Sequence, residues 1–98
     1  MAQFLAVVKR NTDAFSEAEF GPLLEPEAGR ARQLYAQGVV RAMWSRKDVL
    51  GAVLLIEAEN QTEVEGLLNT LPLKAKGMLD VESIVPIGPY RGFGPRTP

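Results

Sequence analysis

Apolar runs with the spacing of β-strands stand near both ends of the patterned part of the chain. Residues 3–9 (Gln-Phe-Leu-Ala-Val-Val-Lys) are rich in β-branched and aromatic side chains, and the polar run 11–13 follows them, which predicts a buried first strand. Residues 80–87 predict the last strand. Because proline cannot donate a hydrogen bond to a sheet, Pro86 indicates that this strand ends at a sheet edge or leaves the sheet.

The middle of the chain predicts a hairpin with two apolar faces. Residues 38–46 and 50–58 form its strands, and Lys47-Asp48 forms the turn between them. Antiparallel pairing about that turn sets Arg41 opposite Leu54 and Trp44 opposite Gly51. Since side chains alternate along a strand, both faces of this hairpin are mostly apolar, and each of them needs a cover.

The first amphipathic segment predicts a helix that ends at Gly38. We expect this helix to begin near Glu25-Pro26, because Gly21-Pro22 and Pro26 interrupt any single long helix that starts at the potential cap Ser16. The apolar stripe, on which Tyr35 is expected to pack, is Leu24, Ala28, Ala31 and Tyr35, with Leu34 beside it.

The second amphipathic segment predicts a helix capped by Asn60, with Glu63 three residues further on. Its apolar residues recur with helical spacing, and they are Val64, Leu67, Leu68 and Leu71. We expect Pro72 to stop this helix and residues 74–77 to form a polar connection to the last strand.

The predicted order of elements is β-α-β-β-α-β, the arrangement of ferredoxin-like α+β domains. In such a domain a four-stranded antiparallel sheet carries both helices on one face and leaves the other face open. That face is too apolar here to remain in water, so a second copy is expected to stack on it as a dimeric α/β barrel. We therefore expect a homodimer or a higher homo-oligomer, with a domain over residues 1–87 and a Gly/Pro-rich tail over residues 88–98.

Composition narrows the possible functions. The 98 residues are 46% hydrophobic and 23% charged, which is typical of one globular domain. Eleven basic and twelve acidic residues leave a formal charge of −1, which argues against nucleic-acid binding. The chain has no Cys and no His, so disulfides, thiolate chemistry and the commonest proton-transfer side chain are excluded, and neither a metal site nor a cofactor is expected. Without a signal-peptide pattern or a membrane-length apolar run, a cytoplasmic location and no membrane contact are expected.

Several motifs of this chain occur together in one known family. They are Gly38, Arg41 and Trp44 on the second strand, Leu71-Pro72-Leu73 at a helix end, and Asp80-Val81-Glu82 at the start of the last strand. On these motifs the sequence resembles the muconolactone isomerase family of dimeric α/β barrels. The resemblance implies small subunits that pair through their sheets and often assemble into rings. It also implies, for the named enzyme, cofactor-free migration of a double bond in an unsaturated lactone of aromatic catabolism.

Arg41 and Trp44 are the predicted substrate-binding residues of the hairpin. Arg41 is the only charge on a predicted face made otherwise of Val, Met, Ala, Leu and Ile, and a buried guanidinium needs an anionic partner. It binds the carboxylate of an acidic ligand, or it forms a structural salt bridge to Glu57, Glu82 or an acid of a partner chain. Trp44 forms a wall for a flat substrate, or it fills the space that a facing glycine leaves.

Three further charged residues are candidates for the site. Glu57 and Glu82 are the predicted catalytic residues, because an apolar cavity that raised the pKa of either would make it a general base. The alternative is that both are solvated strand ends. Lys9 is predicted to attract an anionic substrate at the cavity mouth together with its neighbour Arg10, or else these two residues mark the point where the strand meets water.

The function favoured by these features is a cofactor-free isomerase that acts on an unsaturated lactone or acid by proton transfer, in a cavity at the dimer sheets. Two other functions remain open. One is a non-catalytic oligomeric domain that binds a small hydrophobic ligand. The other is a cofactor-free oxygenase of the dimeric-barrel type, supported only by Trp44 and Tyr90. A cavity with paired polar groups would favour the isomerase over the non-catalytic domain.

Overall fold

The computed structural model describes residues 1–94, so the last four residues of the predicted tail lie outside the described residues. The elements are β1 (Ala2–Arg10), α1 (Glu17–Ala36), β2 (Val40–Ser45), β3 (Gly51–Ala58), α2 (Gln61–Leu68), α3 (Pro72–Ala75) and β4 (Leu79–Ile87). All neighbouring strands are antiparallel, and their order across the sheet is β2-β3-β1-β4. This is the predicted ferredoxin-like α+β arrangement, which is confirmed.

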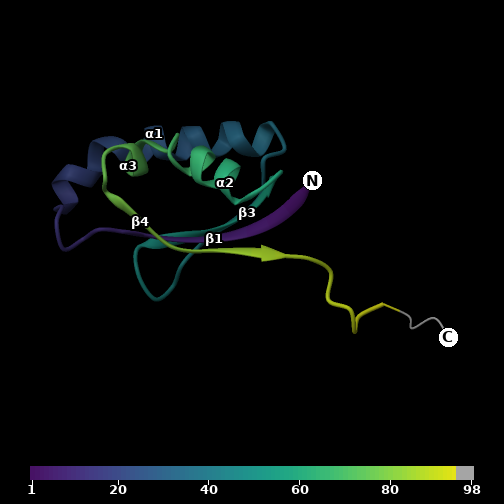
Figure 1. Cartoon of the computed structure of the whole chain (residues 1–98). Coiled ribbons are helices and arrows are strands. Elements are labelled where there is room, and N and C mark those ends of the chain that lie inside the picture. The colour runs from purple at the N-terminus through teal and green to yellow at the C-terminus, as the bar shows by residue number, and fades with distance from the viewer. Residues whose placement is uncertain (95–98) are drawn as a thin grey trace.

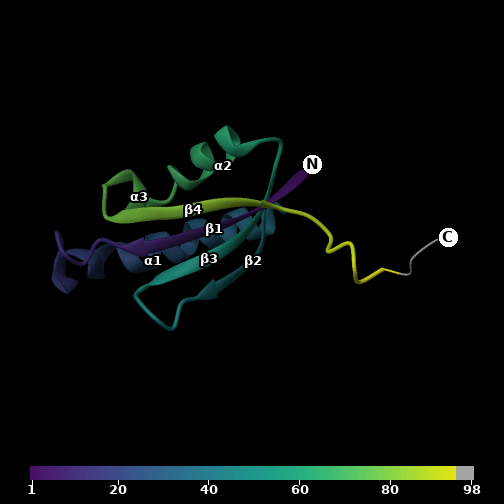
Figure 2. The same ribbon diagram turned by 60° about the horizontal axis from the view of Figure 1, so that its bottom comes forward.

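The helices of the described residues all lie on one face of the sheet (Figure 1), and the opposite face carries no element of residues 1–94. The core fills the space between the sheet and the helices, and its residues have almost no contact with water. Alternate strand residues supply the sheet side, and they include Phe4, Ala6, Val8, Leu54, Ile56 and Ala58. Both views show residues 88–94 leading away from the sheet (Figure 2).

The first helix begins eight residues before the predicted start near Glu25-Pro26, which is therefore wrong. Ser16 caps it by accepting a hydrogen bond from the Glu19 N–H at 3.3 Å. Pro22 and Pro26 both lie inside the helix, and both are exposed. The carbonyl groups that lose their helical partners at these prolines therefore lie on the solvent-exposed side of the helix, where water can replace the missing N–H groups.

The end of α1 is confirmed at Gly38, whose φ of +77° suits glycine. The Gly38 N–H donates to the Tyr35 carbonyl, and the Val39 N–H donates to the Leu34 carbonyl, which is the Schellman pattern. The predicted packing of Tyr35 is wrong, because 65% of this residue is exposed. The earlier helix start brings Phe20 into the core on the same face as Leu34, and Tyr35 lies about 100° around the helix from Leu34.

Pro72 does not follow α2 directly. That helix ends at Leu68, and Pro72 is the first residue of the short helix α3, which occupies part of the predicted polar connection. Proline suits this position because the first N–H of a helix has no internal partner. The cap of α2 is as predicted, since the Asn60 Oδ1 accepts from the Glu63 N–H at 2.9 Å.

The predicted hairpin register is wrong by two residues. Met43 lies opposite Leu54 and Trp44 lies opposite Val53, so Trp44 does not face Gly51. The Arg46 N–H donates to the Gly51 carbonyl at 3.0 Å, which leaves a four-residue loop over residues 47–50. Because this loop is two residues longer than the expected turn, residues 42–45 of β2 each face a residue of β3 two positions further along than predicted.

A β-bulge in β2 also changes which side chains face the helices. The register shifts between Val40 and Ala42, so Arg41 is the extra residue. Val40 is therefore buried under the helices, and the Arg41 side chain is 53% exposed. The prediction that Arg41 is a buried charge on an apolar face is wrong for this reason.

Candidate functional site

The residues nominated from the sequence lie on the helix-free face of the sheet, which we call the open face. Lys9 and Glu57 alternate with buried neighbours on β1 and β3 and so point away from the helices. Trp44 is opposite Val53 on the same side, and 53% of it is exposed. The centre of the open face is apolar and half-exposed, formed by Leu5, Val7, Val53, Leu55 and Val85.

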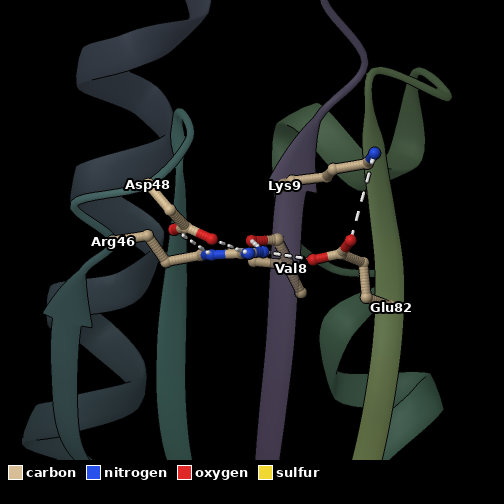
Figure 3. Close-up of polar contacts among 5 residues, drawn as sticks. All are labelled: Val8, Lys9, Arg46, Asp48 and Glu82. Carbon is tan, nitrogen blue, oxygen red and sulfur yellow. Dashed lines mark hydrogen bonds and ion pairs between the residues drawn. The ribbon is translucent and has the colours of Figure 1, made fainter.

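One end of the open face carries a network of charges around Arg46, which is not among the site residues predicted from the sequence. Its guanidinium donates to the Asp48 carboxylate at 3.0 and 2.6 Å, to the Val8 carbonyl at 3.4 Å and to Glu82 (Figure 3). Glu82 also lies 3.9 Å from the Lys9 ammonium. This cluster joins β4 to the hairpin across β1. It could therefore be predicted only from the order and register of the strands.

The network affects the titration of its members. Hydrogen bonding to Arg46 lowers the pKa of Asp48 to about 2, and the two carboxylates raise the pKa of Arg46 further above its usual range. The Arg46 side chain is only 14% exposed. These contacts hold the hairpin loop and β4 together over β1.

The opposite end of the open face carries a second polar group around Glu57. The Gln3 side chain donates to Glu57 at 3.3 Å, and the Arg41 guanidinium lies 3.9 Å from the same carboxylate. Of the two roles considered for Arg41, the structure therefore contains the salt bridge to Glu57. The structure does not bring Glu57 and Glu82 together, because they lie at opposite ends of the open face.

A separate pocket lies on the other side of the sheet, between α1 and the strands, and we call it the Glu27 pocket. Its volume is about 270 Å³, and most of its lining is apolar, including Leu24, Ala28, Leu54, Leu71 and Leu79. Two charged side chains line it, Glu27 from α1 and Arg10 from the end of β1.

Glu27 is half-buried, and its Oε1 accepts a hydrogen bond from the Leu73 N–H of α3 at 2.9 Å. Burial raises the pKa of Glu27, although this hydrogen bond and the charge of Arg10 oppose part of the effect. Glu27 is not among the site residues predicted from the sequence. Its spacing offered a signal, since Glu27 follows Leu24 by three residues and precedes Ala31 by four, which places it beside the apolar stripe.

Arg10 contributes a positive charge to the same pocket. Its guanidinium lies 5.5 Å from the centre of the Phe20 ring, and none of the ion pairs within the described residues includes it. The pocket thus offers a carboxylate of raised pKa and a cation that are not joined to each other. Such a pair can hold an anionic ligand and exchange a proton with it.

Together these features define a small ferredoxin-like α+β protein with an open apolar sheet face and a pocket that holds one carboxylate. Residues 4–90 match the family described as muconolactone delta-isomerase, and the chain belongs to that family. No curated protein sequence matches the chain. Within residues 1–94, every helix is too short or too polar to cross a membrane.

Proposed function

We propose that this chain is an isomerase that moves a double bond in a small unsaturated lactone or acid by proton transfer, without a cofactor. The observation that carries the proposal is Glu27, a half-buried carboxylate of raised pKa in a mainly apolar pocket. Membership of the muconolactone delta-isomerase family supports the reaction class. A raised pKa brings a carboxylate closer to the range in which a general base works best at neutral pH.

The proposed reaction needs one base, which later acts as the acid. The Glu27 carboxylate removes a proton from the saturated carbon next to the conjugated C=C bond, and the electron pair is delocalised through that bond onto the carbonyl oxygen. Glu27 then returns the proton to the other end of the conjugated system, so the double bond has moved and no electrons are gained or lost. The Leu73 N–H holds Oε1, which leaves Oε2 for the proton. Arg10 attracts the substrate carboxylate and stabilises the developing negative charge.

The open face supports a second part of the proposal, namely that two copies pair through it. Its centre consists of apolar side chains that are partly exposed, and no described element covers it. Lys9, Arg41, Trp44, Glu57 and Glu82 would then lie at or beside the interface. A cavity between the two sheets, with Glu57 or Glu82 as the base, is the competing location for the same reaction.

The test is an assay of the purified protein with muconolactone and related unsaturated lactones. We expect Glu27→Gln to lower kcat by ~10²–10⁴-fold, the usual contribution of a general acid–base group. Gln keeps an oxygen for the Leu73 N–H, so the fold should be retained. The matched control is Glu25→Gln on the exposed side of the same helix, which should leave kcat unchanged.

The outcomes separate the two locations. Full activity of Glu27→Gln with loss of activity in Glu57→Gln or Glu82→Gln would move catalysis to the open face. Binding of lactones without turnover by the wild type would contradict the isomerase and support the ligand-binding function instead.

A further inference from the structure

The Glu27 pocket does not end beside Glu27. It shares Ala31 and Met43 with an adjoining hollow of about 440 Å³ between the second half of α1 and β2, which Arg32, Tyr35 and Val40 also line. We call this hollow the α1–β2 groove. It runs along the outer edge of β2, which is an edge strand of the sheet.

The large apolar side chains bordering this path are exposed to an unusual degree. Leu24 at the Glu27 end is 39% exposed, Met43 at the junction is 42% exposed, and Tyr35 at the far end is 65% exposed. Exposed apolar residues that line a continuous hollow are typical of a ligand-binding surface. No segment of residues 1–94 covers these side chains, so the described part of the chain does not occupy the groove.

Charge decides which end of the path takes an anion. At the far end Arg32 is paired with Glu25, and Arg41, which borders the next hollow, is paired with Glu57. Arg10 at the Glu27 end has no such partner among the described ion pairs. A ligand carboxylate is therefore best placed at Arg10, with the rest of the ligand directed along the groove.

We propose that the ligand of the Glu27 pocket is an unsaturated carboxylate bearing an apolar chain, and that this chain lies in the α1–β2 groove between Met43 and Tyr35. The inference rests on the proposed function, because it uses the same pocket. Tyr35 follows Glu27 by eight positions, which corresponds to ~12 Å along the helix and leaves room for a chain of several carbons. Met43, which contacts both spaces, determines which chains fit.

The test measures affinity by calorimetry for a series of straight-chain 2-alkenoic acids of increasing length. Affinity should rise by up to about fourfold for each added CH₂ until the groove is full, because the burial of one CH₂ contributes about 0.8 kcal/mol. Tyr35→Ala should remove the gain for the longest acids and leave the shortest acid unaffected. Tyr90→Ala is the matched control, because Tyr90 is similarly exposed and lies in the segment that leads away from the sheet. Met43→Phe should shorten the longest acid that still gains affinity.

Three outcomes would overturn the inference: affinity independent of chain length, equal effects of Tyr35→Ala on short and long acids, or a matching effect of Tyr90→Ala. Failure of the proposed function looks different. Chain-length-dependent binding without turnover of any lactone would contradict the isomerase and leave the groove assignment standing. Turnover of unsubstituted lactones only, with no gain in affinity from an added chain, would support the isomerase and contradict the groove assignment.

Discussion

Arg46, the residue that follows β2, forms an ion pair with Glu82 of β4, so the pair joins the two edge strands of the sheet across the intervening β3 and β1. Arg46 also holds Asp48 of the hairpin loop and the Val8 carbonyl of β1. Three parts of the chain thus share one guanidinium, which is mostly shielded from water. Networks of this kind stabilise a fold more than isolated surface pairs do.

Replacing Arg46 should therefore weaken the fold. Arg46→Gln leaves two carboxylates without their main partner, and we expect a lower urea midpoint with an unchanged slope. Arg32→Gln is the control, since the Arg32–Glu25 pair is exposed on both sides and should contribute little. Equal midpoints for the two variants would show that the network is only a surface feature.

The stability contributed by Asp48 should depend on pH in acid. Its pKa in the folded protein is about 2, below the ordinary value of 3.8, so the unfolded chain takes up the proton first as the pH falls. The contribution is therefore fully present at neutral pH and is lost between about pH 4 and pH 2. The difference in urea midpoint between wild type and Asp48→Asn should stay constant from neutral pH down to mildly acidic pH and then shrink.

The cause can be checked with a second substitution. In an Arg46→Gln background, Asp48→Asn should have a much smaller effect at neutral pH, because the group that lowers the pKa of Asp48 is gone. An undiminished effect there would point to a source other than Arg46.

Gly51 has no room for a side chain. A Cβ at this position would lie 2.3 Å from the Val8 carbonyl oxygen and 2.9 Å from the Lys9 Cα, and both are backbone atoms of the paired strand. We expect Gly51→Ala to destabilise the protein by ~1–3 kcal/mol or more in urea unfolding. Gly66→Ala in α2 is the control, because nothing lies within 4 Å there and alanine should stabilise the helix by roughly 0.5–1 kcal/mol. A neutral Gly51→Ala would mean that β1 and β3 can separate at no cost.

The packing of α2 predicts different effects for two nearby residues. Leu68 is 2% exposed in the core, so Leu68→Ala should cost about 2–5 kcal/mol. Pro72 begins α3 and is only half-buried, so Pro72→Ala should have a much smaller effect. Chemical denaturation of both variants provides the measurement, and similar losses would contradict this assignment of the core.

The proposed pairing through the open face predicts a concentration-dependent dimer or larger oligomer. Leu55→Lys places a charge at the centre of that face without touching the helix side, and we expect it to give a folded monomer in sedimentation experiments. Lys76→Glu, on the exposed end of α3, is the control and should keep the assembly of the wild type. A wild type that remains monomeric at micromolar concentration would contradict the pairing.

Local patterns in the sequence were enough to predict the order of the elements and the fold class. Alternation and β-branched residues marked the strands, and short-range signals marked helix ends at Gly38 and Asn60, because these depend on residues only a few positions apart. The same patterns were insufficient at the start of α1. Whether a helix continues through Pro22 and Pro26 depends on their facing water, and that depends on how the helix packs on the sheet.

The sites were decided by contacts between distant residues. The four-residue loop and the bulge at Arg41 set which side chains share the open face, and neither is visible in the apolar pattern. Glu27 and Leu73 are 46 positions apart, and only the packing of α1 against α3 brings them together. The burial that raises the pKa of Glu27 and the neighbouring charge of Arg10 arise in the same way, because desolvation and electrostatic proximity are properties of the packed chain and not of any local segment.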